Sequence, residues 1–420
     1  LHYPLRRQRQ MCIRDRQRRI MKDFNAANHI QDLQYFGEFG GVNPSISDSS
    51  TYTFLSAKKM FDTFEGNAEG CYLYSRHSSP SNLYLAQALA KMEGTESANV
   101  TASGMGAITS TILQLCKSGD HIISSRTIYG GTYAFMKNFL PDIKIETSFV
   151  DITDLQKVED SINQNTKVIY CETVSNPLLE VADLKELSRI AKKHDLKLVV
   201  DNTFSPLSVS PQLLGADVTI HSLTKFINGS SDTVGGVYCG TQEFIDATKN
   251  VNSGACMLLG PTMDSLRAAS VLKNLRTLHI RMKKHSENAQ FLAEKWEQDG
   301  LKVKYPGLKS HPQHELYKTM IHEEYGFGGL IALDVETVEK ANELMELMQN
   351  ENLGYLAVSL GFYKTLFSAS GTSTSSEIPE DEQKEMGLSP GLIRFSIGLD
   401  HDIERTYQKM KMCMEKVGVL

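Results

Sequence analysis

Four residues at the ends of two neighbouring apolar runs have the chemical types that one cofactor requires. Asp201 closes the first run, and the second run leads into Ser222, Thr224 and Lys225. A lysine amine can form a Schiff base with an aldehyde, a carboxylate can hold a protonated ring nitrogen, and short hydroxyls can bind a phosphate. Alone, such a lysine is usually a solvated surface residue and such an aspartate a helix cap. Their joint occurrence predicts a site for pyridoxal 5'-phosphate (PLP).

We expect the two motifs to bind different parts of this cofactor. We expect Asp201 to keep the ring nitrogen protonated, because an ion pair in a partly buried site favours both charged forms. Ser222 and Thr224 alternate along what we expect to be an extended segment, so both hydroxyls would reach the phosphate while Lys225 points toward the ring.

Further segments form an ordered series with these motifs. They are Tyr74-Ser75-Arg76 and the stretches 102–107, 128–132, 172–177 and 391–399. With this series the chain resembles the Cys/Met-metabolism (trans-sulfuration) family of PLP-dependent enzymes, across roughly residues 30–415. The resemblance implies PLP as cofactor and a small amino acid as substrate.

Short apolar runs alternate with helix-period segments over much of the chain. The expected strands are 97–102, 121–124, 167–171, 197–200 and 218–221. Apolar strands between helices indicate an α/β protein with a mostly parallel sheet covered on both faces. The resemblance implies the aspartate-aminotransferase-like fold type I of PLP-dependent transferases, with a seven-stranded sheet. Ligands of such sheets bind at the carboxyl ends of the strands.

We predict four parts along the chain. They are a basic head that is non-native or disordered (1–20), an N-terminal arm that contacts the neighbouring subunit (21–80), a PLP-binding large domain (81–270) and a small C-terminal α+β domain (271–420). We expect one long helix, at about Met263 to Trp296, followed by strands near Gly329–Asp334 and Leu392–Ser396. The Ser/Thr-rich run 368–376 predicts a loop.

The resemblance assigns roles to residues that would be ordinary alone. Gly104 and Met105 would offer backbone amides to the phosphate, although such a glycine turn is more often only a helix cap. Tyr129, otherwise a core residue, would stack on the cofactor ring and serve as an acid toward the departing thiol. Asn176, in an Asn-Pro pair that is more often a turn, would donate to the cofactor's phenolic oxygen from an extended pre-proline conformation.

Two further groups of residues are candidates for binding anions. Tyr74 and Arg76 project from the same side of an extended arm, and in the family this pair clamps the phosphate in the adjacent protomer. The resemblance therefore implies a homodimer or homotetramer with shared active sites. Arg394 lies inside an apolar run, where it needs either a structural ion pair or a ligand anion. The resemblance favours the substrate carboxylate, with Ser359 as a helper.

Specificity is where the chain departs from its family patterns. Gly131 stands where methionine gamma-lyases have a cysteine, and Asn252 and Ser253 align with their Lys-Asp pair. Val358 stands where cystathionine-cleaving relatives usually carry a glutamate, which suits a short apolar thioether. The Met-Thr-His of the family's substrate loop is replaced by Thr372-Ser373-Thr374.

The predicted reaction is a carbon–sulfur bond cleavage with Lys225 as the base. We expect γ-elimination of L-methionine-like substrates to 2-oxobutyrate, ammonia and a thiol. The alternatives are cystathionine gamma-lyase, or a γ-replacing cystathionine gamma-synthase or O-acetylhomoserine sulfhydrylase. An aminotransferase would release the keto product without net ammonia. We do not expect an inactive relative to keep the full set of Tyr74, Arg76, Tyr129, Asp201, Lys225 and Arg394.

Composition limits the remaining possibilities. The formal net charge is -6 although the head is rich in arginine, so the rest of the chain should repel nucleic acid. An alternative to a non-native head is a targeting or nucleic-acid-binding arm. Since no apolar run is long enough for a membrane span, we expect a cytoplasmic protein without membrane contact. The scattered cysteines, 7 in number, suggest neither disulfides nor a metal site.

Overall fold

The structure is a computed structural model that describes residues 24–65, 68, 70–369 and 378–420. A 7-stranded sheet forms its centre, in the order β1-β7-β6-β5-β4-β2-β3. The strands are β1 (Ser97–Thr101), β2 (His121–Ser125), β3 (Glu146–Val150), β4 (Thr166–Glu172), β5 (Lys197–Asp201), β6 (Val218–Ser222) and β7 (Gly236–Gly240). Only β7 runs antiparallel to its neighbours within this sheet, so the predicted mostly parallel sheet is confirmed.

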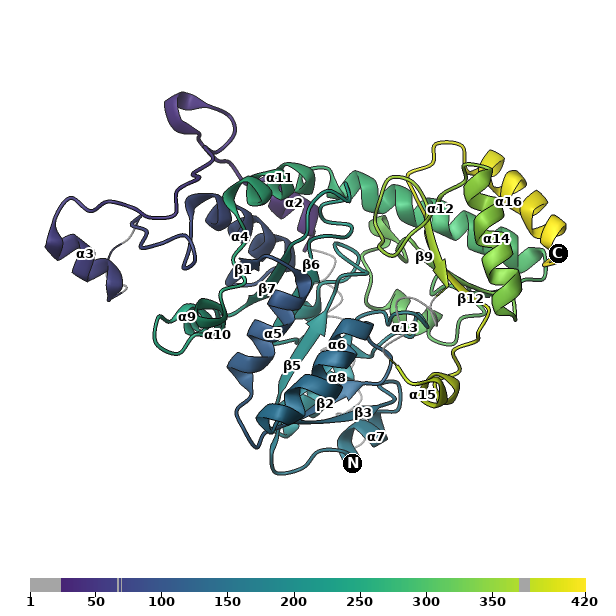
Figure 1. The fold of residues 1–420 in the computed structure, drawn as a ribbon, viewed down its shortest axis with the longest axis horizontal. Coiled ribbons are helices and arrows are strands. Elements are labelled where there is room, and N and C mark those ends of the chain that lie inside the picture. Colours follow the sequence, from purple (N-terminus) through teal and green to yellow (C-terminus); the bar gives the residue numbers. More distant parts are fainter. Residues whose placement is uncertain (1–23, 66–67, 69, 370–377) are drawn as a thin grey trace, which may run out of the picture.

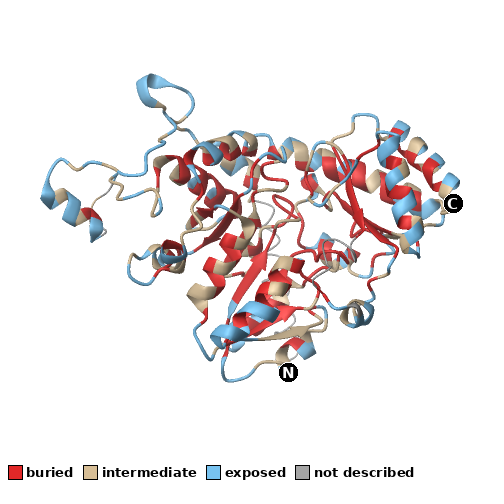
Figure 2. Ribbon diagram, in the orientation of Figure 1, coloured by how far each residue is buried: buried red, intermediate tan, exposed pale blue. Residues whose placement is uncertain are grey.

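Helices cover both faces of this sheet, and its strands are buried between them (Figures 1 and 2). One face packs against α4 (Pro80–Glu93), α8 (Leu184–Lys193) and α11 (Ser265–Leu275), and the other against α5 (Gly104–Leu115) and α6 (Gly130–Ala134). Shorter elements at the rim are η2 (Phe135–Phe139), η3 (Leu140–Ile143), α7 (Leu155–Asp160), η4 (Pro211–Leu214), α9 (Gln242–Lys249) and α10 (Ala255–Leu259). Alternate residues of β2, β4, β5 and β7 enter the two cores, as expected for a doubly covered sheet.

A second, 5-stranded sheet has its own core. Its order is β10 (Tyr355–Leu356), β11 (Leu366–Ala369), β12 (Leu392–Ser396), β9 (Leu330–Asp334) and β8 (Lys302–Lys304). It packs with α12 (Leu278–Gln298), α14 (Val338–Asn350) and α16 (Ile403–Val417). The connecting elements are α13 (His314–Lys318), η5 (Glu323–Tyr325) and α15 (Glu380–Glu385). The strands predicted near Gly329–Asp334 and Leu392–Ser396 are confirmed as β9 and β12.

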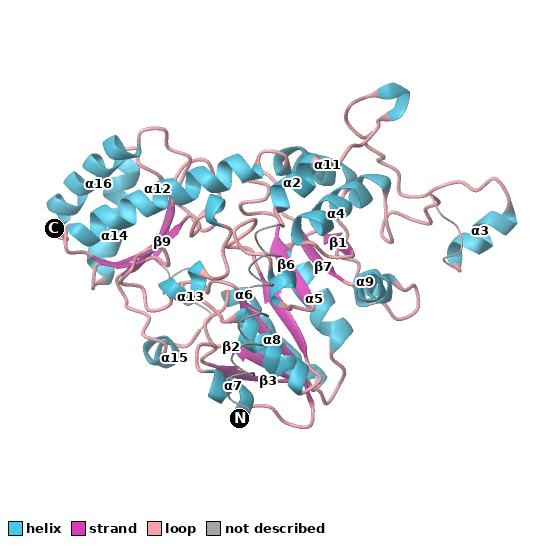
Figure 3. Ribbon diagram, turned by 180° about the vertical axis from the view of Figure 1, so that it is seen from behind, coloured by secondary structure: helices cyan, strands magenta, loops and turns pink. Residues whose placement is uncertain are grey.

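Most of the segment before α4 extends away from the rest of the chain (Figures 1 and 3). It contains α2 (Ala26–Gln31), η1 (Glu38–Gly40) and α3 (Ala57–Phe64). α2 packs on α4, whereas α3 lies at the far end of the projection. Apolar side chains are exposed along it, among them Phe39, Leu55 and Phe61.

Three sequence expectations need correction. Strands β3 and β7 were not predicted, because β3 is a half-buried edge strand and β7 is a short run bounded by glycines. The expected single long helix is two helices, α11 and α12, since the carbonyl of Asn274 accepts from Thr277 and Arg281 instead of continuing the helical ladder. Ser368 belongs to β11 rather than to a loop, while 370–377 and the head 1–20 lie outside the described residues.

Two classes of feature are absent from the described part of the chain. No helix there is long and apolar enough to cross a membrane. No group of three or more His, Cys, Asp or Glu side chains there could hold a metal ion.

Candidate active site

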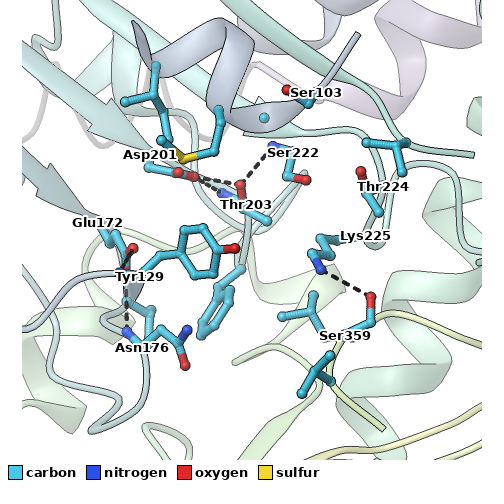
Figure 4. A pocket seen from close by; sticks show the side chains of 18 of the residues that line it. Ser103, Tyr129, Glu172, Asn176, Asp201, Thr203, Ser222, Thr224, Lys225 and Ser359 are labelled. Carbon is cyan, nitrogen blue, oxygen red and sulfur yellow. Dashed lines mark hydrogen bonds between the residues drawn. The ribbon is translucent and has the colours of Figure 1, made fainter. Parts of the chain in front are cut away.

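A pocket of about 410 Å³ lies at the carboxyl ends of β4, β5 and β6, and the loop that follows β10 also lines it (Figure 4). Sequence-predicted residues that line it are Gly104, Met105, Tyr129, Asn176, Asp201, Ser222, Thr224, Lys225, Ser359 and Arg394. Ser103, Glu172, Thr203, Phe204, Val234, Val358 and Leu360 line it as well. The topology thus gathers ten of the predicted residues, from segments far apart in sequence, at one edge of the sheet.

The N-terminus of α5 forms one end of the pocket. Ser103 caps this helix, and its hydroxyl accepts from the amide of Gly106 at 2.9 Å. The first amides of a helix have no acceptor within it, so they can bind an anion. A Cβ on Gly104 would lie 2.9 Å from the Cβ of Ser222, so only glycine lets the helix start approach the serine this closely. Together with Thr224, these groups form a cradle that suits a phosphate.

Asp201 is held at the inner end of the pocket by Thr203. The amide and hydroxyl of Thr203 donate to one Asp201 oxygen at 2.9 and 2.5 Å, and the amide of Ser222 donates to the Thr203 hydroxyl at 2.8 Å. Burial raises the pKa of Asp201, while the bonds from Thr203 oppose that rise. A buried carboxylate of this kind is ready to pair with a cationic ring nitrogen. Sequence reasoning overlooked Thr203, although it follows Asp201 by only two positions.

Lys225 reaches the pocket from a turn, not from the extended segment that the sequence predicted. Its amide donates to the carbonyl of Ser222 at 3.3 Å, and Leu223 between them is buried and bonded to Gly235. The turn arises because Leu223 must enter the core while Thr224 and Lys225 face the pocket. The Lys225 amine donates to the hydroxyl of Ser359 at 3.0 Å. Burial, assisted by the charge of Arg394, lowers the pKa of Lys225 to about 8.

Arg394 enters the pocket from the middle of β12. Its side chain is buried, and it donates to the side-chain oxygen of Asn176 and to the carbonyl of Ser359, both at 3.1 Å. Its Nε has no partner among the described residues. Burial lowers the pKa of this guanidinium to about 10, against the opposing charge of Glu172. An incompletely paired buried cation at a pocket wall can bind a carboxylate.

Glu172 is a pocket residue to which sequence reasoning assigned no role. Its two carboxylate oxygens accept from the amides of Tyr129 at 2.7 Å and Asn176 at 2.8 Å. Burial, and then the neighbouring charge of Asp201, raise the pKa of Glu172 to about 8. An acid at the end of an apolar strand is the signal that identified Asp201, and it could have identified Glu172.

Tyr129 and Asn176 differ locally from their expected settings. Tyr129 is 44% exposed, so it is a pocket residue rather than core, and it precedes α6. The Asn176-Pro177 peptide bond is cis, which the sequence analysis did not predict.

Tyr74 and Arg76 do not line the pocket of their own chain. Tyr74 is 46% exposed in the projecting segment. Arg76 lies over the Tyr74 ring and donates to the carbonyl of Met257 at 2.9 Å. Their entry into the site of an adjacent protomer stays a prediction.

The pocket contains every group that we expected a single chain to contribute to PLP binding. A lysine amine, a buried carboxylate and a helix start with two hydroxyls surround a single cavity. This donor set, on a mostly parallel sheet with a smaller second sheet, defines a fold type I PLP-dependent enzyme.

Comparison with known proteins agrees with this class. The chain belongs to the family of Cys/Met metabolism PLP-dependent enzymes, because the sequence profile of that family matches its residues 27–409. The predicted family, fold and cofactor are therefore confirmed.

Individual relatives cover most of the chain. A methionine gamma-lyase of Arabidopsis thaliana is 45% identical over 396 residues, which is 93% of this chain and 90% of the relative. A cystathionine gamma-lyase of Bacillus subtilis is 36% identical over 90% of this chain and 95% of its own length. A solved Campylobacter jejuni structure, assigned as an O-acetylhomoserine (thiol)-lyase and containing a pyridoxyl-lysine phosphate, is similar with a TM-score of 0.86. The two sequences are 30% identical, and the matched region covers 93% of this chain and 100% of the Campylobacter jejuni chain.

Proposed function

We propose that this chain is a carbon–sulfur lyase that converts L-methionine-like substrates to 2-oxobutyrate, ammonia and a thiol. The proposal rests on the position of Lys225, Asp201 and Arg394 around one pocket, whose lining also includes Val358 and Val234. The similarity to the Arabidopsis thaliana methionine gamma-lyase supports it.

In this proposal the pocket holds PLP by three sets of contacts. Gly104, Met105, Ser222 and Thr224 bind the phosphate, Asp201 pairs with the ring nitrogen, and Tyr129 and Asn176 contact the ring and its oxygen. When bound to Lys225, PLP supplies an electron sink for negative charge that develops at the substrate's Cα.

Lys225 is the proposed base. A lysine whose pKa is lowered to about 8 has a substantial neutral fraction near physiological pH, which proton removal requires. The hydrogen bond to Ser359 holds the amine on one side of the pocket. Lys225 can therefore take a proton from Cα and move protons at Cβ as the γ-substituent departs.

Arg394 and Tyr129 orient the substrate in this proposal. Arg394 has donors in the pocket for the substrate carboxylate. Tyr129 is exposed to the pocket, and its hydroxyl points toward the space in front of Lys225 (Figure 4). It can donate a proton to the departing sulfur.

Two positions bear on the choice of leaving group. Val358 is 61% exposed at the pocket wall, and a neutral apolar side chain there suits a methylthio group better than the charged end of cystathionine. A Cβ at Gly131 would lie 2.6 Å from the Cε1 of Tyr129, so a cysteine at this position would force the tyrosine ring to move.

We also propose an assembly of two or four copies, acting in the cytoplasm, with shared active sites. The projecting segment exposes Tyr74 and the apolar side chains of Phe39, Leu55 and Phe61, which a neighbouring copy can cover. In such an assembly Tyr74 and Arg76 would complete the phosphate site of the neighbour.

Cleavage of cystathionine is a second candidate, because the cystathionine gamma-lyase of Bacillus subtilis is 36% identical to this chain. A γ-replacing synthase is a third, favoured by the similarity to the Campylobacter jejuni structure. The three share the site and differ in the leaving group and in the fate of the product.

Product analysis separates these candidates. Purified enzyme loaded with PLP is incubated with L-methionine, and 2-oxobutyrate, ammonia and methanethiol are measured, with Lys225→Ala as the blank. Equal amounts of the three products support the lyase. Absence of 2-oxobutyrate, together with thioether formation from an activated homoserine ester and a thiol, would replace it with the synthase.

A further inference from the structure

One buried carboxylate joins the two loops that carry Tyr129 and Asn176. Glu172 ends β4, and its oxygens accept from the amides of these two residues at 2.7 and 2.8 Å. Tyr129 belongs to the connection after β2, whereas Asn176 belongs to the connection after β4. Glu172 therefore forms hydrogen bonds with the backbones of two pocket residues at once (Figure 4).

The same network continues to Arg394. The side-chain oxygen of Asn176 accepts from a terminal nitrogen of Arg394 at 3.1 Å. Because an amide has its oxygen and nitrogen on opposite sides, this bond leaves the Asn176 nitrogen as the donor for a ligand. Glu172 thus connects the cofactor side of the pocket with Arg394 on β12.

The charges near Glu172 make a carboxylate at this position unfavourable in free energy if its role is only structural. Glu172 is the register partner of Asp201 on the neighbouring strand, so two buried acids lie side by side. A glutamine of the same shape would avoid the repulsion. It could accept only one of the two amides, however, because its nitrogen would face the other N–H. Burial and Asp201 disfavour the ionised form of Glu172, whereas the charge of Arg394 favours it.

We propose that Glu172 is a positioning residue of the active site, which places Tyr129 and Asn176 against the cofactor and, through Asn176, holds Arg394 for the substrate carboxylate. The part concerning the cofactor depends only on the family's PLP chemistry. The part concerning the substrate rests on the proposed function.

The test compares Glu172→Gln with a matched variant, Glu180→Gln. Glu180 tethers the same two connections, since its carboxylate accepts from the Thr127 hydroxyl at 2.7 Å, but it does not line the pocket. The dissociation constant of PLP is measured by titrating each apoprotein, and the melting temperature of each is recorded. We expect Glu172→Gln to weaken PLP binding by about tenfold or more, and Glu180→Gln to leave it unchanged.

Steady-state kinetics with L-methionine then test the connection to Arg394. We expect a raised KM for Glu172→Gln, and a partial return toward the wild-type value for Glu172→Asp, which keeps the carboxyl group on a shorter side chain. Equal PLP affinity in Glu172→Gln and the wild type, or equal losses in Glu172→Gln and Glu180→Gln, would overturn the proposal. An inactive wild type would instead refute the proposed function, while the PLP titration would still decide the role of Glu172.

Hydrogen exchange of the wild-type apoprotein is an additional test, which does not depend on whether a variant folds. The amides of Tyr129 and Asn176 should exchange slowly, because Glu172 accepts from both. Exchange at the rate of an open loop at either amide would contradict the proposal.

Discussion

The amine of Lys225 donates a hydrogen bond to the hydroxyl of Ser359 at 3.0 Å, and this bond joins the turn after β6 to the loop after β10. Ser359 also accepts from Arg394 through its backbone carbonyl. One residue of the second half of the chain therefore contacts both the proposed base and the proposed carboxylate-binding group.

Replacing Ser359 by alanine should slow the reaction more than it weakens substrate binding. The backbone bond to Arg394 survives in Ser359→Ala, while the amine of Lys225 loses its acceptor. We expect kcat to fall by roughly tenfold, the equivalent of one ordinary hydrogen bond, with KM changed less. Steady-state kinetics check this, with Ser359→Thr as the control that keeps a hydroxyl. A change in KM alone would contradict it.

The reactivity of Lys225 in the apoprotein should reflect its lowered pKa. Burial disfavours the ammonium form, so the amine becomes nucleophilic near pH 8 instead of near pH 10.5. Brief acylation at a series of pH values, followed by mass spectrometry, gives the labelling profile of each lysine. We expect half-maximal labelling of Lys225 at about pH 8. The exposed Lys58 is an internal control for the activity of the reagent at each pH. Half-maximal labelling of Lys225 near pH 10.5 would be inconsistent with the pocket described.

The stability of the apoprotein should depend on pH through Glu172. Its pKa rises from 4.5 in the unfolded chain to about 8 in the fold, mainly because of burial. Above pH 4.5 the unfolded state ionises first, so the folded state loses relative stability as the pH rises toward 8. Urea unfolding of wild-type apoprotein should show the free energy of unfolding falling by up to about 1.4 kcal/mol per pH unit over this range, relative to Glu172→Gln. Parallel curves for the two proteins would argue against the shift.

Much of this site was predictable from sequence because its chemistry-bearing residues follow apolar strands. Asp201, Ser222 and Lys225 could be placed at one sheet edge from that pattern, and Arg394 was conspicuous as a charge within an apolar run. Such patterns do not specify backbone partners. The pair of amides bound by Glu172 depends on two loop conformations, one of which contains the cis Asn176-Pro177 bond.

Features set by long-range contacts were also beyond sequence reasoning. The antiparallel insertion of β7 between β1 and β6 follows from sheet pairing, which periodicity does not reveal. The break between α11 and α12 depends on Arg281, whose guanidinium bonds to carbonyls of Asn274 and of the turn after Lys225. The roles of Tyr74 and Arg76 stay predictions, because they concern a neighbouring copy.

Substituting Val358 should change substrate preference in a defined direction. A carboxylate at this exposed pocket position would attract the distal ammonium group of cystathionine. We expect Val358→Glu to raise the ratio of kcat/KM for cystathionine to that for methionine by about tenfold, with Val358→Gln as the uncharged control. An equal effect of the two variants would show that size, not charge, governs this position.

The proposed γ-lyase activity is best tested by measuring kcat/KM for L-methionine and L-cystathionine side by side, with 2-oxobutyrate as the common product. We predict 2-oxobutyrate from methionine, at a higher kcat/KM than from cystathionine, and none from Lys225→Ala. Product from cystathionine alone, or from neither substrate, would contradict it.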